Sequence, residues 1–304
     1  MRRLIIVMFW SLFCFSTGFS PVWAEGAVQA PNRGALFKVT QENHTLYLFG
    51  TIHVGAADFY PLEARISTAL EQAGVLALEI DPLGDPARMA QAVQRHGLYQ
   101  KGGSAAAELS AAYRAKLERL LRQYQIEPDT VRPMKPWLLA SLLTVNEFSA
   151  QGYDTALAVD AWLSRQAHAR QQTIVELESA ESQMALFDTM SKDEQLRFLQ
   201  ESIDGIEDQE QAQQAREITQ AWRTADRAAL DALARKAEQD DTFSGRFVQK
   251  VLLDSRNPGL AASIAKLLAR EQHSVAAIGV LHLVGPKSVP ELLRKRGLSV
   301  ERIY

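Results

Sequence analysis

Two histidines in this sequence follow the same short pattern, with a glycine three residues before each histidine. His53 ends the tetrapeptide Gly-Thr-Ile-His, and His282 ends Gly-Val-Leu-His. Each tetrapeptide comes directly after an apolar, strand-like segment, residues 45–49 or 274–278. Because glycine permits a sharp change of chain direction, the imidazole three residues later can turn back over the end of the strand. The pattern predicts two imidazoles at one edge of a sheet.

Two glutamates occupy equivalent places after two other predicted strands. Glu79 lies at the end of the apolar run 75–80, and Glu178 lies one residue beyond the strand-like segment 173–177. In sheets built from βαβ units, ligands bind in the crevice outside the carboxyl ends of the strands. We therefore expect four separate segments to deliver two imidazoles and two carboxylates to one site.

This set of side chains suits a divalent metal ion. Neutral imidazole and carboxylate are ligands of Mn, Co, Fe and Zn, and the pattern does not distinguish among these metals. A metal with few protein ligands lowers the pKa of a bound water toward neutrality and so supplies a hydroxide nucleophile. A glutamate that is not a ligand, Glu178 or Glu79, can serve as general acid or base.

Each of these residues also has a structural alternative. A histidine after a strand can be a hydrogen-bonded structural residue. Glu79 lies between two apolar residues of a predicted buried strand, so its carboxylate must be metal-bound, protonated or ion-paired, for example with an arginine. Glu178 stands before a predicted helix, where the positive end of the helix dipole also favours a carboxylate.

The elements around these residues predict an α/β fold. Segments 36–39 and 45–49 flank turn residues and predict a hairpin. A helix over 61–73 followed by a buried strand over 75–80 is typical of a βαβ unit. Further helices are expected within 105–125 and 136–170, and further strands at 173–177, 274–279 and 298–303.

A glutamine-rich, acidic stretch from about residue 181 to 250 predicts a helical insert in a single domain, 25–304. Charges at this spacing are typical of solvated helix faces, and an acidic cation site is the alternative. Asn257 and Pro258 predict the start of a later helix, with Asn257 as the N-cap. The expected architecture is a mixed, largely parallel sheet with flanking helices and this insert.

The first 24 residues have the features of a secretory signal peptide. Arg2 and Arg3 precede the apolar segment 4–15, and Ala24 ends a site of the type that signal peptidase cleaves. The apolar segment is shorter than the about 20 residues that span a bilayer. We expect a periplasmic or secreted protein with no stable membrane insertion after signal cleavage. Cys14, the single cysteine, lies inside the signal, so thiolate ligands are excluded.

The charge balance argues against nucleic acid as a partner. The chain has 33 basic and 36 acidic residues and a formal net charge of −3, so no broad basic field is available. The sequence also lacks a Gly-x-Ser-x-Gly elbow, a His-Glu-x-x-His helix and a phosphate-binding Gly-Lys-Ser/Thr loop. The strand-end residues are therefore the main candidates for chemistry.

Together, the two Gly-x-x-His motifs, the glutamate in Leu-Ala-Leu-Glu-Ile-Asp (76–81) and the signal peptide resemble the TraB/GumN family, which is related to the Tiki proteases. The resemblance spans most of the chain after the signal. Its further marks are Gly152-Tyr153-Asp154, similar to the family's Gly-x-Asp before a helix, Leu177-Glu178-Ser179 in place of the usual Leu-Glu-Thr, and Arg256-Asn257 before the last long helix.

The resemblance implies an α/β fold like that of the haem-binding ChaN and erythromycin esterase relatives. Through the Tiki branch it implies a metal-dependent peptidase that uses both histidines and the glutamate. On this basis the first-choice metal ligands are His53, Glu79 and His282. The catalytic candidates are Glu79, Glu178, Asp154 and Arg256.

Structural alternatives stay open for two of these candidates. Asp154 is also well suited to cap the N-terminus of a helix. Arg256 can bind a substrate carboxylate through two hydrogen bonds, and it is equally suited to be the ion-pair partner of Glu79.

The leading hypothesis is a divalent-metal-dependent hydrolase, peptidase-like, acting on a peptide or another small secreted substrate. The alternative is a non-catalytic protein of the same fold that binds haem, a metal or a glycan. Haem binding calls for an exposed apolar patch with a tyrosine or histidine ligand, whereas hydrolysis calls for a polar, water-accessible metal site. A helical interaction protein built around residues 181–240 accounts for the insert but not for the strand-end residues.

Overall fold

The computed structural model describes residues 30–304, and the predicted signal peptide, residues 1–24, lies outside them. Six strands form one mixed sheet in the order β4-β3-β5-β2-β1-β6. The strands are β1 (Leu36–Gln41), β2 (His44–Thr51), β3 (Val75–Leu78), β4 (Thr173–Glu176), β5 (His273–Gly279) and β6 (Ser299–Arg302).

The sheet is largely parallel and has one antiparallel side. β4, β3, β5 and β2 are parallel neighbours, while β1 pairs antiparallel with both β2 and β6. The predicted hairpin is confirmed as β1 and β2, in which Gln41 faces His44 across a two-residue turn. The predicted α/β class with a mixed, largely parallel sheet is therefore confirmed.

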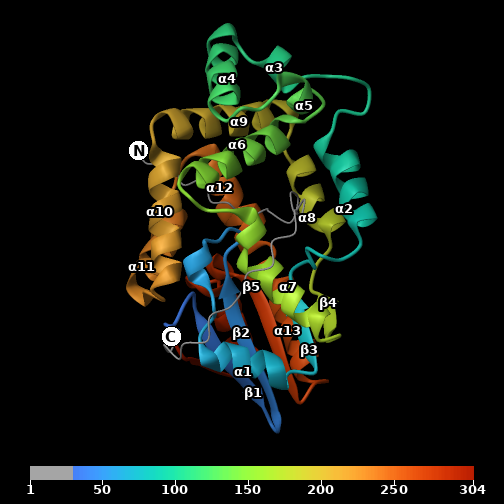
Figure 1. The fold of residues 1–304 in the computed structure, drawn as a ribbon, viewed down its shortest axis with the longest axis vertical. Helices are drawn as coiled ribbons and strands as arrows, with labels where there is room; N and C mark the ends of the chain where they lie inside the picture. Colours follow the sequence, from blue (N-terminus) through green and yellow to red (C-terminus); the bar gives the residue numbers. More distant parts are fainter. Residues whose placement is uncertain (1–29) are drawn as a thin grey trace.

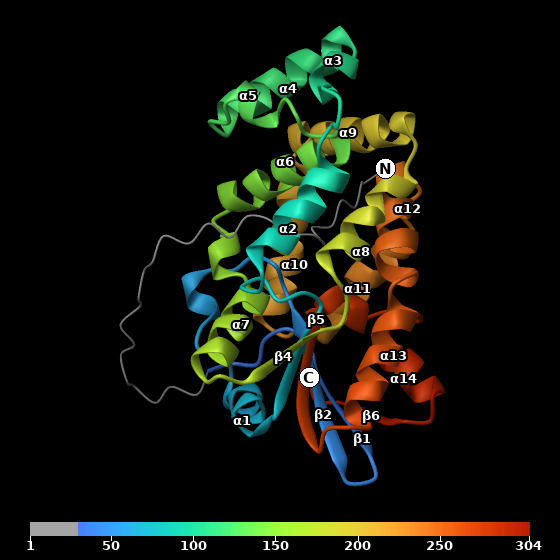
Figure 2. The same ribbon diagram turned by 90° about the vertical axis from the view of Figure 1, so that its right-hand side faces the viewer.

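Helices cover both faces of the sheet, as Figures 1 and 2 show. α1 (Ala64–Gln72) and α7 (Val159–Ala169) lie on one face, and α13 (Asn257–Leu268) and α14 (Val289–Lys295) lie on the other. Each of these helices buries an apolar stripe against the strands, since residues three and four apart share one side of a helix. In α1 the stripe is formed by Ile66, Ala69 and Leu70.

The remaining elements form a helical lobe at the end of the sheet opposite the β1–β2 hairpin (Figure 1). Its helices are α2 (Pro86–Ala92), α3 (Ala105–Glu108), α4 (Ala111–Gln123), α5 (Pro128–Val131), α6 (Pro136–Ala150), α8 (Ala180–Ala185), α9 (Lys192–Glu207), α10 (Glu210–Arg223), α11 (Arg227–Glu238) and α12 (Phe243–Phe247). Two segments, η3 (Val93–Gly97) and η6 (Val248–Asp254), are π-helical. Short 3₁₀ turns are η2 (Ala57–Phe59), η4 (Thr155–Leu157), η5 (Phe187–Thr189) and η7 (Val280–Leu283).

Three predicted helical stretches differ from the structure in detail. The stretch 105–125 is divided into α3 and α4, because the chain is extended at Leu109. The stretch 136–170 is divided into α6 and α7, and Gly152 between them has a φ of +87°, which glycine adopts without strain. The stretch 181–250 is helical, but it is not simply solvated. Its glutamines are partly internal, and the buried ones are Gln183, Gln195, Gln211 and Gln214.

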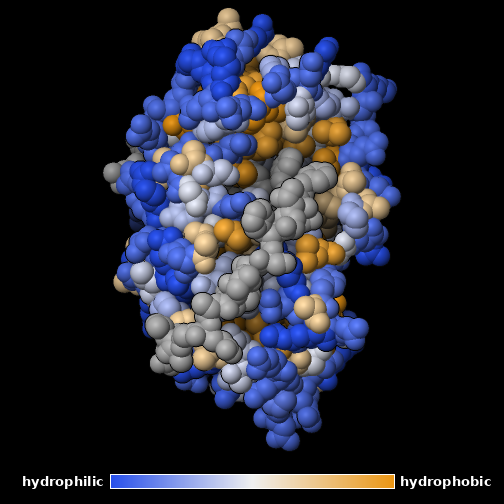
Figure 3. Space-filling view, viewed as in Figure 1, coloured by the Kyte–Doolittle hydropathy of each residue, from blue (hydrophilic) through white to orange (hydrophobic). Residues whose placement is uncertain are grey.

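The outer surface agrees with helices that bury an apolar stripe and expose a polar face. On the face shown in Figure 3, hydrophilic residues cover most of the outer helices and the hairpin. In the part of the chain from residue 30 onward, no helix combines the length and the apolar character needed to cross a bilayer.

Trp222 of α10 joins the helical lobe to the sheet. Its ring is fully buried, and its Nε1 donates a hydrogen bond to the carbonyl oxygen of Gly50 at 2.8 Å. Gly34 donates its N–H to the Trp222 carbonyl at 2.6 Å. A Cβ at Gly34 would lie 2.5 Å from the Gly50 oxygen, so a side chain there would not fit. The lobe therefore fixes the glycine that begins the first Gly-x-x-His segment.

We expect Trp222→Phe to lower the free energy of unfolding by about 1–3 kcal/mol, because the buried carbonyl of Gly50 loses its indole donor. Urea unfolding measures this change. Trp162→Phe is the matched control, since the Trp162 ring stacks on Tyr60 at 5.3 Å and its indole has no hydrogen-bond partner among residues 30–304. Equal losses in the two variants would contradict the assigned role of Trp222.

Candidate functional site

The four predicted strand-end residues follow four neighbouring strands. Glu178 comes after β4, Glu79 after β3, His282 after β5 through the turn η7, and His53 after β2. The sheet order is β4-β3-β5-β2, and these strands are parallel, so their carboxyl ends lie at one edge. This edge faces the helical lobe (Figure 1). The structure thus brings the two histidines and two glutamates together.

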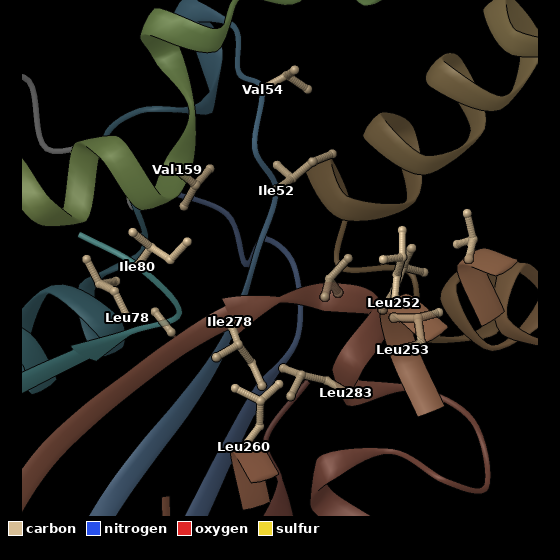
Figure 4. Packing of buried hydrophobic residues seen from close by; sticks show 14 of the residues in the cluster. Ile52, Val54, Leu78, Ile80, Val159, Leu252, Leu253, Leu260, Ile278 and Leu283 are labelled. Carbon is tan, nitrogen blue, oxygen red and sulfur yellow. The ribbon is translucent and has the colours of Figure 1, made fainter. Parts of the chain in front are cut away.

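Apolar neighbours determine the direction of these polar side chains. Successive residues of an extended chain point to opposite sides, so a polar residue between two core residues is directed away from the core. Figure 4 shows this packing beside the site. Ile52, Val54, Leu78, Ile80 and Leu283 are buried and adjacent in sequence to site residues, and the buried Ile278 directly precedes Gly279.

His53 is oriented by a carboxylate from the first turn of α7. Its Nδ1 lies 3.1 Å from Oδ2 of Asp160, a residue that is only 7% exposed. Since a carboxylate accepts hydrogen bonds, Nδ1 carries the proton and Nε2 is left to face the sheet edge. Burial lowers the pKa of His53, but the charge and hydrogen bond of Asp160 and the charge of Glu79 outweigh it, so the pKa is raised.

His282 is oriented by an amide at the start of α13. Its Nδ1 lies 2.5 Å from Oδ1 of Asn257, whose Nδ2 donates to the carbonyl of Lys287 at 2.9 Å. The buried Nε2 of His282 has no hydrogen-bond partner among residues 30–304. Burial and the nearby Arg256 guanidinium lower the pKa of His282 to about 3, so this imidazole is neutral and its Nε2 lone pair is available.

The predicted capping role of Asn257 is wrong. Arg256 occupies the N-cap position of α13 without a side-chain capping bond, and Asn257 is the first helical residue. Its amide is directed to His282 instead. The chain enters α13 from the π-helix η6, so the cap position has helical rather than extended backbone angles and an ordinary capping geometry does not form.

Glu79 and Glu178 share one buried arginine. Nη2 of Arg256 contacts both carboxylates, and Nε donates to both oxygens of Glu178 at 3.1 Å. Gln183 of α8 also bridges the pair, since its Nε2 donates to Glu178 at 2.9 Å and to Glu79 at 3.2 Å. The ion pair between Glu79 and Arg256, one of the two alternatives for this arginine, is present.

Electrostatics keep this ion pair charged. Burial raises the pKa of Glu79, but Arg256, the two histidines and the Gly279 N–H oppose it, and the resulting pKa lies well below the usual range. Burial lowers the pKa of Arg256, yet the two glutamates outweigh this effect and the pKa rises. The carboxylate and the guanidinium therefore stay ionised although both are almost fully enclosed.

Gly279 borders a space shared by three of the candidate ligands. Its N–H donates to Oε1 of Glu79 at 2.6 Å. A Cβ built on this glycine would lie 3.4 Å from Oε1 of Glu79, 3.6 Å from Nε2 of His53 and 3.7 Å from Cδ2 of His282. The three side chains therefore surround one small space, which the missing side chain of Gly279 keeps open.

Asp154 caps a turn beside the segment that follows His53. Its exposed carboxylate accepts a hydrogen bond from the N–H of Ala156 at 2.8 Å and caps the turn η4. Its backbone exchanges two hydrogen bonds with Gly55, each 2.8 Å long. Asp154 thus fixes the segment after His53 through its backbone and takes the capping role that was its alternative.

Three residues of the site were not among the sequence-based candidates: Asp160, Asn257 as a partner of His282, and Gln183. All three come from helices. A carboxylate between the apolar neighbours Val159 and Ala161 is a signal that could have identified Asp160, since a buried charge needs a partner. Nothing in the local sequence distinguishes Gln183 from the other glutamines of the insert.

The site in this form is a pair of oriented histidines beside a glutamate–arginine network. Within residues 30–304, no three His, Cys, Asp or Glu side chains are grouped so as to hold a metal ion. Oε2 of Glu79 is directed to Arg256 and Gln183, while Oε1 accepts from Gly279 and lies on the side of the shared space.

We expect Arg256→Met to lower the free energy of unfolding by about 3–5 kcal/mol in chelator-treated protein, because two carboxylates are left without their cation. Arg88→Met is the control, since Arg88 is 78% exposed and forms one surface ion pair, worth less than about 1 kcal/mol. Urea unfolding compares the two variants.

The same variant tests the sign of the pH dependence. The folded-state pKa of Glu79 is depressed below its ordinary 4.5, so the stabilisation by Arg256 is present above pH 4.5 and is lost as the pH falls below it. The stability difference between wild type and Arg256→Met should therefore shrink in acid. A difference that grows toward low pH would refute the assignment.

Comparisons with known proteins agree with the resemblance seen in the sequence. Two relatives are the uncharacterized protein YbaP of Escherichia coli (strain K12) and that of Shigella flexneri; each is 25% identical over 261 residues, which cover 83% of this chain and 89% of the relative. No solved structure matches. The TraB/PrgY/gumN family model matches residues 35–302. The chain therefore belongs to the TraB/PrgY/gumN family.

Proposed function

We propose that this protein is a divalent-metal-dependent hydrolase, peptidase-like in its chemistry, in which His53, His282 and Glu79 hold the metal. The observation that carries the proposal is the Nε2 atom of His282, which is buried, neutral and without a partner among residues 30–304. A buried polar atom without a partner is costly, and a metal ion would remove that cost.

The residue types of the donor set suit a metal, although within residues 30–304 the three side chains are not yet grouped as ligands would be. Imidazole ligands of metals ordinarily give their other ring N–H to a carboxylate or a carbonyl, which fixes the tautomer. His53 has such a partner in Asp160, and His282 has one in Asn257. Oε1 of Glu79 accepts one hydrogen bond and keeps a further lone pair. The donor atoms of Glu79 and His53 and the ring edge of His282 border the space beside Gly279.

A divalent metal bound here would polarise a substrate carbonyl and lower the pKa of a bound water. The protein's own contribution is positioning. Asp160 and Asn257 orient the imidazoles, while Arg256 holds Glu79 ionised as a ligand must be. Glu178 is the more accessible of the two carboxylates, with an 18% exposed side chain against 8% for Glu79. Glu178 is therefore our candidate for proton transfer to or from the substrate.

The contacts of Arg256 determine whether it can reach a substrate. Arg256 contacts the two glutamates and the Leu252 carbonyl, and its side chain is only 3% exposed. A buried arginine with these contacts fixes the positions of the two carboxylates and is not available to bind a substrate carboxylate. We therefore place Arg256 in support of Glu79 and Glu178.

We also propose a fold relationship and a location for this protein. A site at the carboxyl edge of parallel strands, covered by helices, supports a fold relationship to ChaN and erythromycin esterase. The signal-like residues 1–24 support a periplasmic or secreted location and hence a peptide or other small secreted substrate.

We expect His53→Ala and His282→Ala each to abolish metal binding, because each removes one of the two imidazole ligands. Elemental analysis of purified protein and calorimetric titration with Mn, Co, Fe and Zn measure binding. His273→Ala is the control, since His273 is exposed at the start of β5, away from the carboxyl edge. Full metal occupancy in either site variant would refute the ligand assignment.

Hydrolysis is tested separately with a peptide library, with and without chelator. Wild type should cleave peptides and lose that activity with chelator, while Glu178→Gln should keep its metal and lose about 10²–10⁴-fold in rate. Metal binding without any turnover would leave a metal-binding protein and would reject the hydrolase.

Gly279→Ala tests the shared space itself. The added methyl would make contacts of 3.4–3.7 Å, which are ordinary, and φ at this residue is −51°, which alanine adopts readily. We expect a change in unfolding free energy of about 1 kcal/mol or less, but loss of metal binding because the methyl enters the space between the ligands. Gly259→Ala, where nothing lies within 4 Å, is the control and should bind metal normally.

A further inference from the structure

A third histidine, His96, lies in an ion cluster outside the site described above. Nδ1 of His96 lies 2.5 Å from Oδ2 of Asp188, and Nε2 lies 2.9 Å from Oε1 of Glu181. Arg95 contacts Glu181 at 2.6 Å and Lys135 contacts Asp188 at 2.7 Å. These five residues are the charged groups that face one another here, and we call them the His96 cluster.

The geometry requires a charged imidazole. A carboxylate only accepts hydrogen bonds, and a neutral imidazole has one N–H and one lone pair. With a carboxylate at each ring nitrogen, His96 satisfies both only when both nitrogens carry protons. Burial lowers the pKa of His96, but the hydrogen bonds and charges of Glu181 and Asp188 outweigh it, so the pKa is raised above 6.5.

The cluster joins the π-helix η3 to the segment α8–η5. His96 lies in η3, whereas Glu181 lies in α8 and Asp188 in η5. The backbone of the same region is fixed by Trp137, whose Nε1 donates to the His96 carbonyl at 3.0 Å. Trp137 stacks on Phe187 at 4.3 Å, so packing and charge hold the same two segments together.

The other side of α8 reaches the candidate functional site. Gln183, two residues after Glu181, donates to both Glu79 and Glu178. The position of this amide therefore depends on where α8 lies. α8 has only six residues, so it depends on such contacts more than a long helix does.

We propose that the imidazolium of His96 positions α8, and through it Gln183, against the glutamates of the site. His96 is a positioning residue that acts through Glu181 and α8. Loss of its second proton removes one hydrogen bond and places a ring lone pair against a carboxylate, so α8 loosens as the pH rises. The effect of this loosening on turnover rests on the function proposed above. Amide exchange in α8 and the protonation of the His96 ring can be measured without metal or turnover.

The sign of the effect follows from the raised pKa. The stabilisation is complete below the ordinary histidine value of 6.5 and is lost as the pH rises through the folded-state pKa. Hydrogen–deuterium exchange of residues 179–188, corrected for the intrinsic pH dependence and followed between about pH 6 and pH 9, measures it. We expect exchange of α8 amides in wild type to become about tenfold or more faster across this range.

In His96→Gln, the α8 amides should exchange fast already at the lowest pH, and their exchange rate should show no further step as the pH rises. His168→Gln is the matched control. His168 also pairs with a carboxylate, that of Asp81 at 2.8 Å, but His168 lies on α7. This control should keep the wild-type step. A step that persists in His96→Gln, or wild-type exchange that does not depend on pH, would overturn the proposal.

A measurement on the unaltered chain covers the case in which His96→Gln does not fold. The ¹⁵N chemical shifts of the His96 ring report directly whether both nitrogens carry protons. We expect both to be protonated at pH 6.5 and the titration to coincide with the change in α8 exchange. A neutral His96 ring at pH 6.5 would refute the positioning role.

Discussion

The site depends on one constraint: two carboxylates lie at the end of a buried sheet, and one enclosed arginine must balance them. Glu79 and Arg256 are each nearly inaccessible, and the cost of taking such charges out of water is several kcal/mol per ion. Removing one partner would leave the others uncompensated. The contacts of Glu178, Gln183 and the Gly279 N–H with this pair are therefore needed to keep the network satisfied.

Side chains from the helices orient the site residues that follow the strands. The strands deliver His53, His282, Glu79 and Glu178 to one edge, but every partner that orients them through a side chain comes from a helix or its first turn. Asp160 comes from α7 and Gln183 from α8, while Arg256 and Asn257 stand at the start of α13. The helical lobe and the flanking helices thus act on the chemistry of the site, and Trp222 ties the lobe to the first Gly-x-x-His segment.

The sequence predicted the sheet residues well because strand ends leave a local mark. An apolar run followed by glycine or a carboxylate is visible in a few residues, and parallel pairing then places such ends side by side. The partners of these four residues were missed for the opposite reason. Asp160, Asn257 and Gln183 reach the site from distant segments, and local rules favour other roles for Asn257 and Gln183. An asparagine before a proline at a helix start suggests a cap, and a glutamine in an acidic stretch suggests solvent.

A departure from regular α-helix explains why the capping rule failed at Asn257. A π turn closes its hydrogen bond one residue later than an α turn, and such segments occur frequently at functional sites. η6 leads directly into Arg256 and Asn257, and η3 contains His96. In both places the widened turn changes which face of the helix a side chain occupies relative to a regular 3.6-residue period. Arg256 can then reach Glu79 and Glu178 from the cap position of α13, and His96 can lie between Glu181 and Asp188. A period-based interpretation assumes a regular helix that starts at an ordinary cap. That assumption does not hold at Asn257, so the sequence predicts a capping amide where the structure directs the amide to His282.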